Sequence, residues 1–310
     1  MIDITQWLIL APALILAILS GYLSERVGIV NIAINGMMIF GAIFFNIFSN
    51  VFFQAYNEDA SVSFNMTFLA SFLISAILGV LVGGLFGFAV IKLKCDHVIG
   101  GTGINLIAPG IGLIVSDNAP AIFNGQSSLA NKYTYISSLD INGVHAEAII
   151  CFVISLIIIA GVYVFMNFTK YGLRYRSIGE NPNAADSQGI NVIKYKWIGI
   201  LFVGAIASFA GALFAYYIPG SSFSGDVNGL GFIALALLIV SSWKIIPGFI
   251  IGLLFSLLYV YTANIITPNQ EIQYMLKIIP FVLTIVVMIL FGRFSIGPKA
   301  VGQHFNKGAR

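Results

Sequence analysis

Residues 146–168 read AEAIICFVISLIIIAGVYVFMNF, a run that is apolar at almost every position. About 20 apolar residues in a helix suffice to cross the hydrocarbon core of a bilayer, so this run is long enough to span a membrane. It is continuous and does not alternate between polar and apolar residues. In lipid, only a helix satisfies its own backbone hydrogen bonds within one segment, which argues against a β-barrel. The run therefore predicts an all-α integral membrane protein.

The composition extends this prediction to the whole chain. Hydrophobic residues make up 59% of the 310 residues and charged residues only 9%, whereas soluble domains carry about 25% charged residues. We therefore expect a single transmembrane domain over residues 1–310, a polytopic helical bundle of about nine transmembrane helices (8–10). The runs at 27–49, 98–118 and 228–243 are the weakest, and an even number of crossings follows if one re-enters. The predicted spans are 4–23, 27–49, 66–91, 98–118, 146–168, 198–218, 228–243, 246–266 and 273–292.

Basic residues are distributed unevenly between the two sides of these spans. If the amino terminus lies outside, 13 of the 15 Lys and Arg residues fall in inward-facing loops or near the carboxy terminus. Lys132 alone lies in an outer loop, and Lys277 lies near the outer end of the last span. Because Lys and Arg favour the cytoplasmic side, we expect an outer amino terminus and a cytoplasmic carboxy terminus.

Small residues recur every four positions in several spans and predict faces where helices approach closely. They are Gly79, Gly83 and Gly87 in the third span, Gly204, Ser208 and Ala212 in the sixth, and Gly248 and Gly252 in the eighth.

The longest inward-facing segment, residues 169–197, reads TKYGLRYRSIGENPNAADSQGINVIKYKW. Asn181 can cap a helix, Pro182 suits its first position, and Gly189 can end it in a left-handed conformation. The predicted helix at 182–188 has only two turns, too few to be stable alone in water. Either a partner holds this helix, or the segment is a solvated cytoplasmic loop.

Asparagines are the main polar side chains expected inside the membrane. Asn31 and Asn35 are four residues apart, on one face of the predicted second span, and Asn105 lies in the Gly-rich, Pro-containing fourth span. A buried amide in lipid must be paired or must serve a pathway. We predict that Asn31, Asn35 and Asn105 line a substrate pathway, and interhelical hydrogen bonding is the alternative.

The sequence gives no sign of catalysis or of a resident cofactor. It contains no G-x-x-x-x-G-K-[ST] motif for the phosphates of ATP. Cys95, Asp96 and His97 lie in a short loop without further Cys or His nearby, so we expect no metal site. The scattered histidines and the lack of a carboxylate deep within the predicted spans, away from their ends, argue against an enzyme. No feature indicates a nucleic acid partner.

Three stretches resemble a known family. Residues 172–192, GLRYRSIGENPNAADSQGINV, are similar to the cytoplasmic coupling loop of permease subunits of ATP-binding-cassette importers of the branched-chain amino acid and ribose type. Residues 24–42, SERVGIVNIAINGMMIFGA, and 229–248, GLGFIALALLIVSSWKIIPG, resemble the nucleoside and simple-sugar branch of these permeases.

The resemblance implies a type II importer-like permease in the bacterial plasma membrane, surrounded by lipid, that imports nucleosides or related simple sugars. It implies cytosolic ATPase subunits that hold ATP and magnesium, a second, nonidentical permease subunit, and an extracellular substrate-binding protein or lipoprotein. It places ATPase coupling in the loop, at Gly172, Arg174, Gly179, Glu180, Asn181, Pro182, Ala184, Ala185 and Gly189.

The alternative function is a secondary transporter of a small polar solute, driven by an ion gradient. Such a transporter needs titratable or ion-coordinating groups at the midplane of the membrane. Apart from Lys277, no acidic or basic residue lies inside a predicted span away from its ends. This distribution argues strongly against proton coupling and less strongly against sodium coupling through backbone carbonyls.

Overall fold

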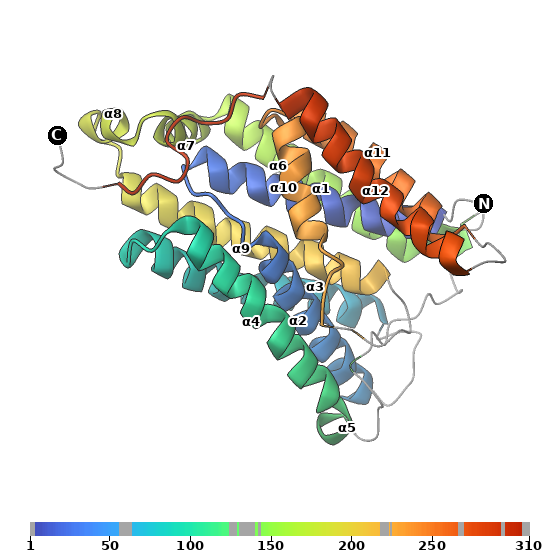
Figure 1. Cartoon of the computed structure of the whole chain (residues 1–310). Helices are drawn as coiled ribbons and strands as arrows, with labels where there is room; N and C mark the ends of the chain where they lie inside the picture. Colours follow the sequence, from blue (N-terminus) through green and yellow to red (C-terminus); the bar gives the residue numbers. More distant parts are fainter. Residues whose placement is uncertain are drawn as a thin grey trace.

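The computed structural model describes residues 4–55, 64–123, 129, 140–141, 144–217, 223, 225–265, 270–292 and 295–305. Most of these residues are helical (Figure 1). The long helices are α1 (Ile4–Arg26), α2 (Ile34–Ala55), α3 (Phe64–Gly87), α4 (His97–Asp117), α6 (Ala146–Phe168), α9 (Val192–Tyr217), α11 (Ile245–Ala263) and α12 (Gln270–Phe291). The short elements are the π-helical turn η1 (Phe88–Lys92), helices α5 (Ala119–Ile122), α7 (Lys170–Glu180), α8 (Pro182–Ser187) and α10 (Leu230–Val240), and the antiparallel strands β1 (Asp140–Ile141) and β2 (Val144–His145).

Within the described ranges, seven helices are long and apolar enough to cross a membrane: α1, α2, α3 with η1, α4, α6, α9 and α11. The prediction of an all-α polytopic membrane protein is confirmed. The run at 228–243 forms only α10, which has 11 residues and spans about 17 Å at 1.5 Å per residue. The bilayer core is about 30 Å thick, so α10 does not cross by itself. The expected total of about nine crossings stays a prediction.

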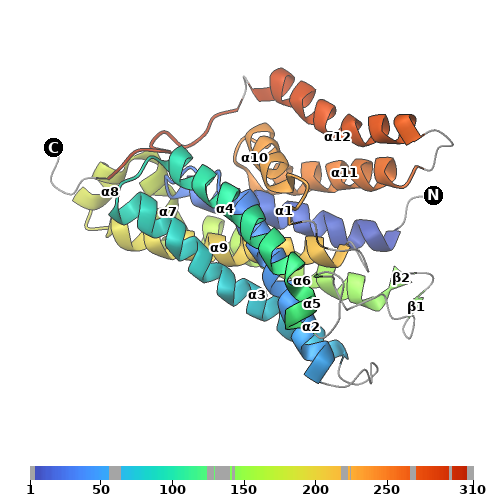
Figure 2. The ribbon, with the colours of Figure 1, turned by 60° about the horizontal axis from the view of Figure 1, so that its bottom comes forward.

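Helices α1 and α9 form the centre of the bundle. Helix α1 packs against α6, α9, α10 and α11, whereas α9 also packs against α2 and α3 (Figures 1 and 2). Along α1, residues 9–25 are all buried, which explains why this helix is apolar on every side.

Glycines allow the central helices to approach closely. A Cβ atom at Gly83 of α3 would lie 2.6 Å from the carbonyl oxygen of Ile200 in α9. A Cβ atom at Gly79 would overlap the side chain of Ser208, and one at Gly252 of α11 would lie 2.8 Å from the Ile15 side chain of α1. The predicted small-residue faces of α3, α9 and α11 are therefore true contact faces.

Large hydrophobic side chains cover the outside of the bundle. Leu106 on α4 is 78% exposed, and Leu85 on α3, Ile157 on α6 and Ile289 on α12 are exposed to a similar degree. An apolar surface of this extent is expected to face lipid or another subunit.

Candidate functional site

The α7–α8 segment is built by local capping at both of its helices. The Thr169 hydroxyl accepts a hydrogen bond from the Gly172 N–H of α7 at 3.0 Å, and the Asn181 side chain accepts one from the Ala184 N–H of α8 at 3.0 Å. Gly189 follows α8 with a φ of +77°, a left-handed conformation that glycine adopts without strain. The short helix predicted at 182–188 is confirmed and ends one residue earlier, at Ser187. Helix α7 was not predicted, although Thr169 is a recognisable capping residue.

Helix α7 is fixed to the ends of α6 and α1. A Cβ atom at Gly172 would overlap the backbone of α6 at Phe165, and one at Gly179 would overlap the carbonyl oxygen of Arg26 at the end of α1. Between these glycines, the hydroxyl of Tyr175 is buried and donates a hydrogen bond to the Leu23 carbonyl oxygen at 2.7 Å. Burial raises the pKa of Tyr175 well above its ordinary value, so the side chain stays a neutral donor.

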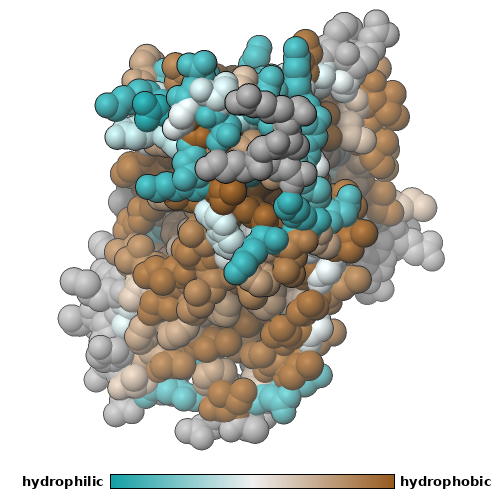
Figure 3. All heavy atoms as spheres, turned by 90° about the vertical axis from the view of Figure 1, so that its left-hand side faces the viewer, coloured by the Kyte–Doolittle hydropathy of each residue, from teal (hydrophilic) through white to brown (hydrophobic). Residues whose placement is uncertain are grey.

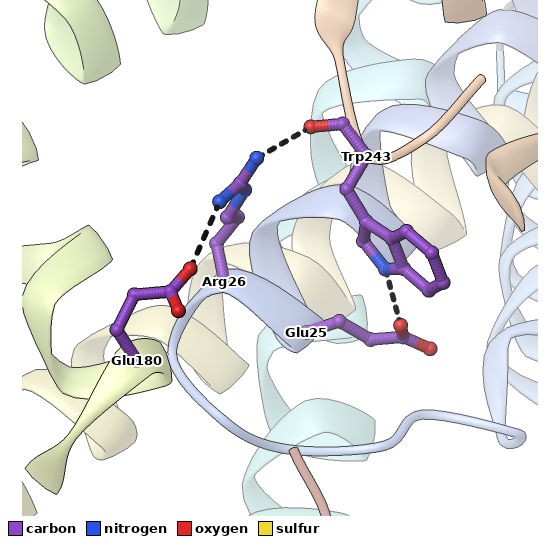
Figure 4. A network of polar contacts seen from close by, with 4 residues as sticks. All are labelled: Glu25, Arg26, Glu180 and Trp243. Atoms are coloured by element: carbon purple, nitrogen blue, oxygen red, sulfur yellow. Dashed lines mark hydrogen bonds and ion pairs between the residues drawn. The ribbon is translucent and has the colours of Figure 1, made fainter. Parts of the chain in front are cut away.

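A polar network joins the end of α7 to α1 and to the residues after α10 (Figure 4). The Arg26 guanidinium lies 3.7 Å from the Glu180 carboxylate and donates a hydrogen bond to the Trp243 carbonyl oxygen at 2.8 Å. The indole N–H of Trp243 in turn donates to the carboxylate of the buried Glu25. The four residues come from three elements, so movement of α7 would act on both α1 and the end of α10.

The carboxy-terminal segment 295–305 lies along the same end of the bundle. The N–H of Ala300 donates to the carbonyl oxygen of Gly179 at 2.9 Å, and the N–H of Gly302 donates to that of Gly28 at 3.3 Å. The Lys196 ammonium donates to the carbonyl oxygen of Gln303 at 3.3 Å. This segment therefore fastens the end of α7 to the loop after α1 and to the beginning of α9.

The nine predicted coupling residues fall into two groups in this arrangement. The residues that attach the segment to the bundle are buried: Gly172, Gly179, Pro182 and Ala185. The residues on the free surface are exposed: Arg174, Glu180, Asn181, Ala184 and Gly189. Viewed from the side of α8, hydrophilic residues gather over part of this end, next to a broad hydrophobic surface (Figure 3). The segment is thus anchored on one side and open on the other.

Helices α2 and α10 both begin inside the bundle. The side chain of Asn105 links α4 to the start of α2, and that of Asn35 links α2 to the start of α10. The Asn105 side chain accepts a hydrogen bond from the Gly36 N–H of α2 at 2.7 Å and donates one to the Ile32 carbonyl oxygen at 2.8 Å. The Asn35 side chain accepts one from the Gly231 N–H of α10 at 3.2 Å. Because the first N–H groups of a helix have no partner within it, these amides cap α2 and α10 from neighbouring helices.

Asn31 does not lie where the sequence prediction placed it. Helix α2 begins at Ile34, so Asn31 belongs to the irregular segment before it, and the prediction that it shares a helix face with Asn35 was wrong. Its side chain is fully buried and donates a weak hydrogen bond to the Met37 sulfur at 3.8 Å. Its side-chain oxygen has no hydrogen-bond partner among the described residues.

Helices α2 and α10 therefore meet near their first turns inside the bundle, where the Gly231 N–H donates to the Asn35 side chain. Each follows an irregular segment, 27–33 before α2 and the described residues 223 and 225–229 before α10. The second lies along α4, where the Ser116 hydroxyl donates to the Phe223 carbonyl oxygen at 3.1 Å and a Cβ atom at Gly112 would lie 3.0 Å from Gly225. Irregular backbone is tolerated inside a membrane only where protein buries it or where it lines a cavity. Helices that begin or break inside the bundle are a recurring feature of transporters.

Long apolar helices, two helices that begin inside the bundle and a short anchored helix at one end are typical of a polytopic membrane permease. The chain belongs to the family described as the permease component of the branched-chain amino acid transport system, which matches residues 3–288. This membership confirms the resemblance of the three stretches, places the chain among transporter permeases, and implies an ATPase and a substrate-binding partner in general.

Individual relatives match over nearly their full length. The chain is 34% identical to a nucleoside ABC transporter permease of Lactococcus lactis over 99% of this chain and 97% of the relative. It is 31% identical to a guanosine ABC transporter permease of Bacillus subtilis over 98% and 96% of the two chains. An uncharacterised protein of Mycoplasma pneumoniae is 47% identical over 99% and 97%. No solved structure matches the chain.

Proposed function

We propose that this chain is the permease subunit of an ATP-binding-cassette importer that moves nucleosides across the bacterial plasma membrane. The family membership and the two nucleoside-transporter relatives support this substrate class. ATP and magnesium bind to separate ATPase subunits, consistent with a sequence that has no P-loop motif. A second, nonidentical permease subunit and an external substrate-binding protein or lipoprotein complete the assembly.

The observation that carries the proposal is the anchoring of α8 on one side only. Its Pro182 and Ala185 are buried against the bundle, while Ala184 is exposed. In the proposal, an ATPase subunit contacts Ala184 and its exposed neighbours Arg174, Glu180, Asn181 and Gly189. Closure of the ATPase subunits then pushes α8, and the contacts of Gly179 and Glu180 with Arg26 pass the movement to α1. A rigid connection of this kind can switch a bundle between two states.

This mechanism requires α7 and α8 to lie on the cytoplasmic side, with the amino terminus outside. The structure groups Arg26, Lys196 and Lys299 at the end of the bundle that carries Gly179. Such a cluster of basic residues supports the cytoplasmic assignment.

We place the translocation pathway beside the contact of α2 with α10, next to the segment 27–33 that carries Asn31. The buried Asn31 oxygen has no described partner there, and such a group is a candidate for contact with a polar substrate. The amide groups of Asn35 and Asn105 already serve as helix caps. In the proposal, Asn35 and Asn105 therefore contribute by fixing the helices next to Asn31, and Asn31 itself contacts the substrate.

Uptake by proteoliposomes tests the function. The tagged chain is purified from its own host with its partners, and labelled guanosine is compared with ribose and leucine as substrates. We expect an ATPase and a second permease to copurify, and we expect guanosine uptake that requires internal ATP and survives an uncoupler. Uptake that follows an imposed ion gradient without ATP would instead establish the secondary transporter. Preference for leucine or ribose would contradict the nucleoside assignment.

A further inference from the structure

A cavity of about 210 Å³ lies at the end of the bundle that carries the carboxy-terminal segment. Its polar lining consists of Lys94, His97, Lys196 and His304, and apolar residues such as Ile29 and Phe305 complete its wall. No acidic residue lines it among the described residues. A cavity of this size has room for a tetrahedral anion with several waters, since a water occupies about 30 Å³ in the liquid.

Lys196 is the group that most requires a ligand. Its side chain is only 5% exposed, and its ammonium has one recorded partner, the Gln303 carbonyl oxygen at 3.3 Å. Within the described ranges, the one ion pair joins Arg26 to Glu180, so no described carboxylate neutralises Lys196. A buried charge without a counter-charge is costly, and a bound anion would remove that cost.

The histidines provide further donors. The N–H of Val30 donates to Nδ1 of His97 at 3.2 Å, so a neutral His97 ring carries its proton on Nε2. The ring of His304 lies against it in an edge-to-face arrangement, with centroids 5.1 Å apart. The nearby Asp96 uses its carboxylate to accept hydrogen bonds from the N–H groups of Val98 and Ile99, at 2.8 and 3.2 Å.

From this geometry we infer that the cavity is a binding site for a phosphate group, held by Lys196 and Lys94 with His97 and His304 as hydrogen-bond donors. The phosphate comes from a free cytosolic anion or from a lipid headgroup. The bound group bridges α9, the beginning of α4 and the carboxy-terminal segment. Because that segment also holds Gly179, occupancy would stabilise the resting position of α7. This site is separate from nucleoside transport and does not depend on it.

Binding of inorganic phosphate to the purified full-length permease, measured by titration calorimetry at constant ionic strength, tests the site. The variant is Lys196→Met, which keeps the apolar stem and removes the charge. The matched control is Lys194→Met, two residues away on the same helix but exposed and outside the cavity. For a free anion, we expect saturable binding that weakens at least tenfold in Lys196→Met and is unchanged in Lys194→Met.

A second measurement distinguishes a free anion from a lipid headgroup and also checks that the variants are folded. Thermal midpoints are compared in phosphatidylcholine nanodiscs with and without phosphatidic acid. A rise caused by phosphatidic acid in the wild type and in Lys194→Met, but not in Lys196→Met, identifies a lipid headgroup. His304 is an exposed residue of the carboxy-terminal segment. His304→Ala removes one hydrogen-bond donor from the cavity and should weaken the binding of phosphate or of phosphatidic acid, whichever is observed. Absence of saturable binding to both probes, or equal binding by wild type and Lys196→Met, would overturn the inference.

Discussion

The Arg26 guanidinium lies 3.7 Å from the Glu180 carboxylate and thereby connects the last residue of α1 to the last residue of α7. Arg26 also donates to the Trp243 carbonyl oxygen and lies over the Tyr22 ring, 5.5 Å from its centroid. The two side chains are unequally buried, at 20% and 49% exposure. Arg26 is therefore the more buried of the two residues and has more contacts with the bundle.

Because Arg26 is more buried than Glu180, replacing Arg26 should lower the free energy of unfolding by more than replacing Glu180. Glu180→Gln should lower the free energy of unfolding by less than about 1 kcal/mol, because exposed ion pairs contribute little. Arg26→Gln should cost more, because it also removes the contacts with Trp243 and Tyr22. Thermal unfolding of both variants and of the double variant in detergent measures this. A larger loss for Glu180→Gln would show that the carboxylate has a structural role that these contacts do not explain.

Adjacent alanines on α8 should separate folding from coupling. Ala185 is 4% exposed, so Ala185→Arg should reduce the yield of folded permease. Ala184 is exposed, so Ala184→Arg should leave the thermal midpoint within about 2 °C of the wild type, as expected for a surface change. In the proposed function it should nevertheless reduce guanosine uptake and ATPase copurification at least tenfold. The control Gln303→Arg changes an exposed residue at the same end but outside α7 and α8; full coupling in Ala184→Arg would contradict the role of α8.

Replacing the Asn105 amide should weaken the junction of α2 and α4. Asn105→Ala removes the acceptor for Gly36 and the donor to Ile32, at a cost of about 1–2 kcal/mol. Thr102→Ala is the control, because the exposed Thr102 hydroxyl bonds only within its own helix, to Ile99. Thermal unfolding and the KM for guanosine are measured together. A changed KM at unchanged stability would indicate that Asn105 contacts the substrate directly.

Gly41 of α2 should tolerate no side chain. A Cβ atom there would overlap the Ser208 carbonyl oxygen of α9, whereas one at Gly110 of α4 would meet nothing within 4 Å. We expect Gly41→Ala to destabilise the bundle by about 1–3 kcal/mol or more. Gly110→Ala should be neutral or slightly stabilising, because alanine has the higher helix propensity. Equal unfolding midpoints for the two variants would refute the close packing of α2 on α9.

Helix caps and apolar spans could be predicted from the sequence because each depends only on residues that are neighbours in the chain. The run at 146–168 forms α6 with the same bounds. Helix α8 begins at Pro182 after the Asn181 cap, as predicted, and ends at Ser187, one residue before the predicted end. Helix α7 was not predicted although Thr169 can cap its start, because the contacts that hold it, made by Gly172, Tyr175 and Gly179 with distant helices, are not visible in a local pattern.

The sequence by itself determined that this chain is a helical membrane protein with a short helix after Asn181, because hydropathy and capping are properties of contiguous residues. Only the tertiary structure decided that 228–243 forms a half-length helix, that Asn35 and Asn105 cap helices other than their own, and that Ala185 is buried while Ala184 is exposed. These features depend on which backbone groups lack local partners and which distant side chains reach them, and that is settled only when the helices pack.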